Sequence, residues 1–135
     1  MNKTVWLARI LSTGGVLETG VGLVLLVDPS ALAFLLLRSP LEGAGLVVAR
    51  IGGGGVLSLG IACWCARQAP LTPAGLGVSR AFLAYNLVAC VTLALARPAL
   101  ASGGLPALGA SVLHGVLAAA LLGALFGPRR SSAGP

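Results

Sequence analysis

The chain has 135 residues, of which 57% are hydrophobic and only 9% are charged, with a mean hydropathy of +1.00. Water-soluble domains carry about a quarter of their residues charged, so the composition excludes such a domain and predicts a multi-pass protein of the cell inner (plasma) membrane. The formal net charge is +6. Because the basic residues are scattered between apolar runs and form no patch, nucleic acid is not expected as a partner.

Apolar runs long enough to cross a bilayer, which takes about 20 helical residues, occur four times in the chain. We expect spans at about 10–27, 44–66, 78–96 and 105–126, so that residues 1–127 form one all-α, four-helix transmembrane bundle. The run 31–37 is too short to cross. It is interpreted as an interfacial or re-entrant turn, or as a kinked continuation of the first helix beyond Pro29. Residues 128–135 are expected to form a disordered basic tail.

The basic residues predict the orientation of this bundle through the positive-inside rule. An even number of spans places both termini on the same side of the membrane. If that side is the cytoplasm, six of the nine basic residues lie inside, Arg38 and Arg97 lie outside, and Arg50 lies within a span and does not count. The inside set is Lys3, Arg9, Arg67, Arg80, Arg129 and Arg130. We therefore expect cytoplasmic N and C termini.

The first span carries a carboxyl group, Glu18, near its middle. An isolated charge in hydrocarbon is costly, so Glu18 must face protein, a wet cavity or a partner, or carry a proton. Gly14 and Gly22 lie one turn to either side of it on the same face, where they are expected to let another helix approach closely. A second helix-packing ridge consists of Gly45, Ala49 and Gly53.

Alternating the direction of the four spans brings four polar residues to roughly mid-depth, while Arg50 enters from the outer side and is long enough to reach inward toward Glu18 or outward toward the headgroups. We expect these residues to form a central cluster for binding or structure. The cluster consists of Glu18, Arg50, Tyr85, Asn86 and His114. Two interpretations of Glu18 and Arg50 stay open: a buried ion pair that fixes helix register, or a proton or ligand site. For His114 a hydrogen-bonded neutral imidazole is favoured over a metal ligand, because the chain has no second histidine and such sites usually need more ligands.

Sequence patterns of common enzymes are absent from the chain. It has no P-loop, no dinucleotide-binding glycine pattern, no HExxH and no G-x-S-x-G, each of which would mark a known site geometry. One histidine and three acidic residues make a conventional hydrolase hard to assemble. We expect no catalytic residues, no metal and no cofactor, and a non-enzymatic role is favoured.

Several short motifs follow one another along the chain. They are Glu18 with Asp28-Pro29, then Arg50-Ile51-Gly52-Gly53 leading to Leu59-Gly60 and Trp64, then Tyr85-Asn86, and finally His114. Together these motifs resemble those of small bacterial four-helix membrane proteins broadly similar to DoxX. The resemblance implies a four-helix bundle and, as in some DoxX-like proteins, an association with quinone-linked or redox membrane enzymes. It carries over no catalytic residue.

A glutamate in the first of four spans is also similar to the membrane-embedded glutamate of the small multidrug-resistance transporters. That resemblance implies exchange of protons for cationic substrates, usually in a dimer. Two features of this chain differ from that pattern. Arg50 could neutralise Glu18, and few aromatic residues are available to line a cation pocket.

Three functions follow as expectations, in order of preference. The first is an accessory or structural subunit of a larger membrane complex, or a homo-oligomer, because Gly14, Gly15, Gly20 and Gly22 exceed what one four-helix bundle needs at its centre. The alternative is a proton-coupled small-molecule transporter or an intramembrane ligand-binding protein that uses Glu18. An enzyme acting on a lipid or quinone inside the bilayer comes third.

Overall fold

The computed structural model describes residues 2–96 and 104–127, and these residues are all-helical apart from short connections. Within them lie the helices α1 (Lys3–Val27), α2 (Pro29–Leu37), α3 (Ala44–Ala66), α4 (Pro73–Ala96) and α5 (Leu105–Phe126). The four helices other than α2 are long and apolar enough to cross a membrane. The number of long apolar helices predicted from the sequence is therefore confirmed, and the predicted tail 128–135 lies outside the described residues.

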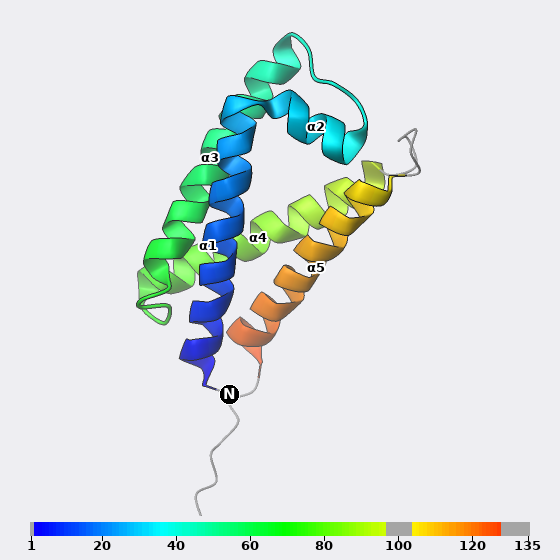
Figure 1. Cartoon of the computed structure of the whole chain (residues 1–135). Helices are drawn as coiled ribbons and strands as arrows, with labels where there is room; N and C mark the ends of the chain where they lie inside the picture. Colours follow the sequence, from blue (N-terminus) through cyan, green and yellow to red (C-terminus); the bar gives the residue numbers. More distant parts are fainter. Residues whose placement is uncertain (1, 97–103, 128–135) are drawn as a thin grey trace, which may run out of the picture.

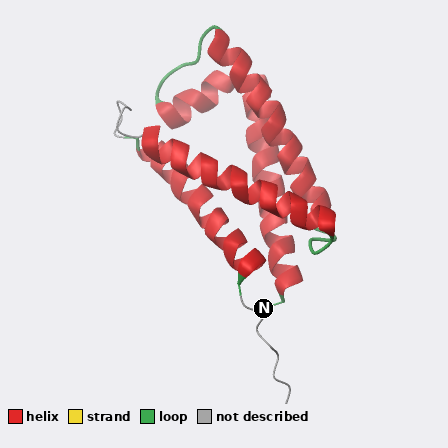
Figure 2. Cartoon of the chain, turned by 180° about the vertical axis from the view of Figure 1, so that it is seen from behind, coloured by secondary structure: helices red, strands yellow, loops and turns green. Residues whose placement is uncertain are grey.

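The long helices are arranged as two antiparallel hairpins (Figure 1). Helix α1 packs along α3, and α4 packs along α5. Seen from behind, α4 crosses obliquely in front of the first hairpin (Figure 2). The start of α1 and the end of α5 meet at one end of the molecule, where Lys3 Nζ donates a hydrogen bond to the carbonyl oxygen of Leu125 at 3.0 Å. The interior of the bundle thus lies between two hairpins that cross obliquely, and the four long helices are not all parallel to one axis.

Residues 31–37 lie in a short separate helix, α2, and not in the irregular turn that was one interpretation of this segment. At Asp28 the backbone leaves the helical region, with φ −138° and ψ 80°, and the Asp28 carboxylate accepts a hydrogen bond from the Ala31 amide at 3.0 Å. Pro29 occupies the first position of α2, where its missing N–H would have had no helical partner. The helix contacts α1, α3 and α5 and folds across one end of the hairpins (Figure 1).

Helices α1 and α4 begin earlier than the spans expected from residues 10 and 78. The side chain of Asn2 accepts a hydrogen bond from the Thr4 amide at 3.0 Å, at the start of α1. The Thr72 hydroxyl accepts one from the Gly75 amide at 3.2 Å, at the start of α4. Hydropathy marks apolar residues, whereas capping side chains decide where a helix begins. The expected loop before residue 78 is therefore partly helical.

Glycines bring the backbones of α1 and α3 into direct contact. A Cβ atom on Gly22 would lie 2.5 Å from a backbone nitrogen of α3, and one on Gly60 would lie 2.6 Å from a backbone nitrogen of α1. Gly15 and Gly53 face the opposite backbone in the same way, at 3.1 Å or more. Because Gly15 and Gly22, like Gly53 and Gly60, are seven residues apart, each helix presents one continuous glycine face. This contact sets the register of the first hairpin.

The second hairpin docks on the first through a fully buried aromatic ring, Phe82 of α4. The ring occupies the place that a side chain on Gly14 would take. Gly14 therefore faces α4, whereas Gly22 faces α3, so the expectation that both glycines line one helix contact is wrong. Their spacing of eight residues turns the helix by about 80° beyond full turns, enough to point them at different neighbours.

The second expected ridge is also divided between different surroundings. Gly53 packs against α1, where a Cβ atom would lie 2.6 Å from Leu25 Cβ. Ala49 is half-buried. The nearest group to a Cβ atom on Gly45 is the side chain of Leu41 in the preceding loop, at 3.5 Å. Only the C-terminal part of this ridge therefore contributes to the close helix contact.

Candidate functional site

Glu18 lies in the middle of α1 with only 3% of its surface exposed. Helix α3 approaches its backbone closely, since a Cβ atom on Gly60 would lie 3.1 Å from the Glu18 carbonyl carbon. From α4, the Tyr85 side chain lies near the Glu18 carboxyl. Cys63, near the same carboxyl, is fully buried. The carboxyl thus points into the protein interior, enclosed by α1, α3 and α4.

Two further polar residues, Asn86 and His114, extend the group from Tyr85 to α5. The rings of Tyr85 and His114 lie edge to face, with centroids 5.6 Å apart and planes at 83°. His114 Nδ1 lies 2.9 Å from Asn86 Oδ1, and Asn86 Nδ2 donates to the Phe82 carbonyl oxygen at 2.8 Å. Glu18, Tyr85, Asn86 and His114 therefore form a continuous group on three helices, which we call the Glu18 cluster.

Asn86 determines which nitrogen of His114 carries the proton. Because the Asn86 amide nitrogen is directed at the Phe82 carbonyl, its oxygen faces the imidazole and can only accept. His114 Nδ1 must then be the donor, and in the neutral ring Nε2 is left as an acceptor. The cluster thus contains a carboxyl, a phenol and an imidazole lone pair, which are the groups that bind or relay protons.

Replacing Asn86 with leucine is expected to remove this tautomer preference. Hydrogen bonds between membrane helices are worth about 1 kcal/mol, which corresponds to about a fivefold change in the tautomer ratio. The chain has a single histidine, so ¹⁵N-histidine labelling gives one imidazole whose NMR shifts report the ratio directly. Ser111→Ala, which alters the same helix pair without touching the ring, serves as the control, and an unchanged ratio in Asn86→Leu would contradict the assignment.

Arg50 does not belong to the Glu18 cluster. Its Nε donates to the Leu26 carbonyl oxygen at 3.3 Å, and its side chain is exposed. In the antiparallel α1–α3 pair Gly60 lies opposite Glu18, so Arg50, ten residues earlier on α3, is displaced by about 15 Å along the helix axis. The structure therefore does not form the buried Glu18–Arg50 ion pair that was one expectation.

Other basic side chains of the described chain also lie away from the buried carboxyl. Lys3 donates to a backbone carbonyl of α5 at 3.0 Å. Arg38 and Arg67 stack on aromatic rings at 5.7 and 3.9 Å. Arg9 and Arg80 are exposed. Within residues 2–96 and 104–127, the Glu18 carboxyl is thus buried without a cationic partner.

Contacts between α4 and α5 that place His114 were missed by sequence reasoning. The Ser111 hydroxyl donates to the Cys90 carbonyl oxygen at 2.8 Å. A Cβ atom on Gly115 would lie 3.3 Å from Cys90 Sγ. The sequence does indicate this contact, because Ser111 and Gly115 are small residues at four-residue spacing on the helix that carries the histidine, a pattern typical of close helix packing. They hold α5 close enough for His114 to reach Asn86.

The part of the chain that the structure describes brings together no group of three or more His, Cys, Asp or Glu that could hold a metal ion. Cys63 is buried and Cys65 is exposed, so the two thiols face different surroundings. The chemistry that the Glu18 cluster supports is therefore hydrogen bonding, proton exchange and binding of a positive group at the carboxyl.

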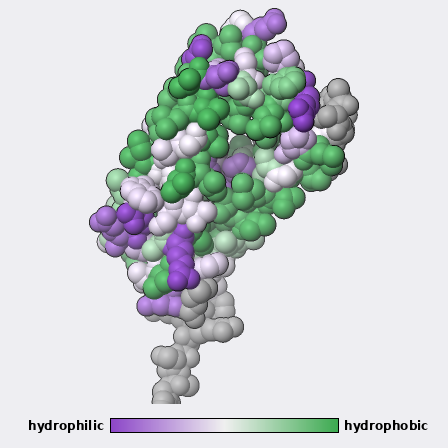
Figure 3. All heavy atoms as spheres, in the orientation of Figure 1, coloured by the Kyte–Doolittle hydropathy of each residue, from purple (hydrophilic) through white to green (hydrophobic). Residues whose placement is uncertain are grey.

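The Glu18 cluster is not sealed on every side. Tyr85 and His114 are only half-buried, whereas Asn86 is fully buried. Figure 3 shows hydrophilic atoms recessed within the apolar surface between α1 and α5, below α2. A polar interior beneath an apolar outer surface is typical of a binding site placed within a membrane protein.

Comparison with known proteins gives no relative for this chain. No family model, no curated protein and no solved structure matches it. The resemblance to DoxX-like proteins therefore stays a prediction from short motifs, and the function is argued from the Glu18 cluster.

Proposed function

We propose that this protein is inserted in the cell inner membrane through α1, α3, α4 and α5, with both termini in the cytoplasm, and that it exchanges protons for a small cationic molecule at Glu18. The length and apolarity of the four helices support insertion. The excess of basic residues near the expected cytoplasmic ends supports the orientation.

The observation that carries the proposal is the burial of Glu18 without a cationic partner among the described residues. A carboxylate at this depth is costly unless a positive group neutralises it. A proton or a bound cation can do so, but one carboxyl cannot hold both. Competition for Glu18 therefore links the release of a proton to the binding of the cation, which is the requirement for coupled exchange.

Tyr85 and His114 are proposed to position the two competing occupants. The Tyr85 side chain lies near the Glu18 carboxyl, and the Tyr85 ring lies edge to face with the His114 imidazole. A change of charge at the carboxyl is therefore proposed to act on Tyr85 and, through its ring, on the surroundings of His114. Asn86, which is bonded to both His114 and the α4 backbone, keeps the imidazole in place.

Proteoliposomes with an enclosed pH-sensitive dye test the proposal. With an inward-directed proton gradient, vesicles loaded with the lipophilic cation tetraphenylphosphonium are compared with cation-free vesicles. Proton movement that depends on the cation is expected only when the protein is present. A smaller quaternary ammonium ion, tetramethylammonium, defines the size of the accepted cation. Proton movement equal to that of protein-free vesicles with every cation tried would contradict the proposal.

A second candidate is the accessory subunit or homo-oligomer, and one observation favours it. Positions Gly52 and Gly55 of α3 have no atom within 4 Å of where a Cβ would stand, so a helix of another subunit can approach there. The glycines that first suggested this role support it less, because Gly14, Gly15 and Gly22 face helices of the same chain. Extraction in native membrane particles with mass determination tests it, and loss of the larger species in Gly55→Leu is the expected result.

A further inference from the structure

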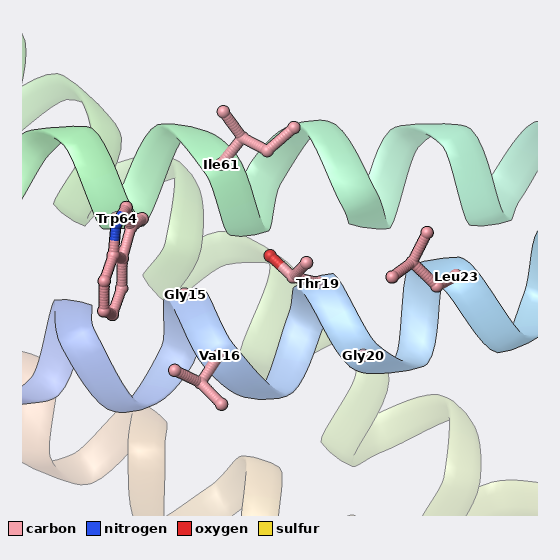
Figure 4. A pocket seen from close by; sticks show the side chains of 7 residues that line it. All are labelled: Gly15, Val16, Thr19, Gly20, Leu23, Ile61 and Trp64. Atoms are coloured by element: carbon pink, nitrogen blue, oxygen red, sulfur yellow. The ribbon is translucent and has the colours of Figure 1, made fainter.

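An apolar groove of about 470 Å³ runs along the outer surface of the first hairpin. Figure 4 shows its side chains, with Leu23 of α1 toward one end and Trp64 of α3 toward the other. The groove exists because α1 has no side chain at Gly20, where nothing lies within 4 Å of a Cβ position. The groove is lined by apolar side chains, among them Val16, Leu23 and Ile61. Such a lining is suited to a hydrocarbon chain.

A half-buried cationic side chain, that of Arg67, lies beside Trp64 at that end of the groove. The guanidinium carbon of Arg67 stands 3.9 Å from the centroid of the Trp64 ring. Its Nε atom is buried and has no hydrogen-bond partner among the described residues. A buried donor without a partner is costly, and a guanidinium offers a planar set of donors that matches the oxygens of a phosphate. Arg67 is thus able to bind an anionic group.

Arg9 adds a second positive charge at the same end. It precedes Val16 by seven residues, so it lies on the groove face of α1, and its side chain is exposed. The Gly15–Trp64 contact fixes the antiparallel register of α1 and α3. Arg67, one turn beyond Trp64, is therefore level with the part of α1 between Arg9 and Gly15. Two arginines on neighbouring helices flank one end of an otherwise apolar groove.

We propose that the α1–α3 groove is a specific site for an anionic phospholipid. The phosphate is held by Arg67 and Arg9, and one acyl chain lies along the groove past Trp64 and Gly20 toward Leu23. Arg67 gains the partner that its Nε lacks among the described residues, and the apolar groove is filled by hydrocarbon. A helix of a second copy would cover the groove but would leave the Arg67 guanidinium without an anion.

Competition between two phospholipids with the same acyl chains tests the site. The purified full chain is titrated with phosphatidylglycerol and phosphatidylcholine, and bound lipid is counted by native mass spectrometry. The wild-type protein is expected to retain phosphatidylglycerol about tenfold more strongly, because two basic side chains near the headgroup favour an anionic lipid. Arg67→Gln is expected to remove most of this preference, Arg67→Lys to restore part of it, and Arg80→Gln, on exposed α4 surface, to leave it unchanged.

Filling the groove gives an independent test that leaves both arginines in place. Gly20→Leu puts a side chain into space that is empty in the structure, so the fold is expected to survive, while lipid retention falls for both headgroups. Equal retention of the two lipids by the wild type, or wild-type retention by both Arg67→Gln and Gly20→Leu, would overturn the proposal. A dimer that disappears in Gly20→Leu without any change in lipid binding would assign the groove to a second copy instead.

Discussion

Glu18→Gln is expected to reduce coupled proton movement to the level of protein-free vesicles. The amide keeps the size of the side chain, but it neither releases a proton at accessible pH nor carries the charge that attracts a cation. Because the substitution removes a carboxyl that is buried without a cationic partner among the described residues, it is expected to leave helical content intact and not to lower stability. Flux and circular dichroism measured on the same preparation separate the two effects.

Glu42→Gln is the matched control for this variant. Glu42 is exposed in the connection before α3, and the same change of charge there is expected to leave proton movement unaltered. Coupled movement that persists in Glu18→Gln would remove Glu18 from the proposed function. Loss in both variants would attribute the effect to the net charge of the protein rather than to the buried carboxyl.

Gly22→Ala and Gly60→Ala are expected to destabilise the protein, each by about 1–3 kcal/mol, as overpacking in a close contact does. The new methyl group would meet backbone atoms at 2.5 and 2.6 Å, and backbone cannot move aside as a flexible side chain can. The α1–α3 pair must therefore separate. Unfolding in mixed micelles of increasing denaturing detergent, followed by circular dichroism, measures the loss.

Glycines that face outward on the same helices provide the controls. Gly20 and Gly52 have nothing within 4 Å of a Cβ position, so alanine there meets no obstacle and gains helix propensity of up to about 1 kcal/mol. Gly20→Ala and Gly52→Ala are expected to be neutral or stabilising. If all four alanine variants had the same stability, close packing at Gly22 and Gly60 would not hold the hairpin together.

The four long helices were predictable because the hydropathy and the length of an apolar run can be read from the sequence without knowledge of its contacts. For residues 31–37 the sequence left two interpretations open, an interfacial or re-entrant turn and a kinked continuation of the first helix, since the separate helix α2 depends on the cap by Asp28 and on contacts with α1, α3 and α5. Its short length gave no periodicity to distinguish a helix from an interfacial turn. Capping residues such as Asn2 and Thr72 likewise moved helix starts beyond the apolar runs.

Depth within the span grouped four of the five cluster residues but misplaced the fifth. Glu18, Tyr85, Asn86 and His114 share a depth and lie together. Arg50 was included because an arginine side chain is long. Its distance from Glu18 follows from the α1–α3 register, which the glycines set and which no single helix reveals. Pairs of glycines seven residues apart on both helices carried that information in the sequence.

The orientation of glycines around α1 illustrates the same limit. A spacing of four residues was used to place Gly14, Glu18 and Gly22 on one face, but each step of four turns the helix about 40° beyond a full turn. Over eight residues this separates contacts with Phe82 from contacts with α3. Sequence spacing thus gave the presence of close helix contacts, while the identity of each partner required the three-dimensional arrangement.

One spectroscopic experiment tests most directly whether the Glu18 cluster acts as a unit. The chain has two glutamates, Glu18 and Glu42, and a single histidine, so labelling with ¹³C-glutamate and ¹⁵N-histidine gives three assignable groups. We expect the Glu18 carboxyl and the His114 imidazole to change over the same pH step, and Glu18→Gln to remove that step from the His114 signals. His114 signals that titrate identically in the wild type and in Glu18→Gln would contradict the coupling on which the proposed function depends.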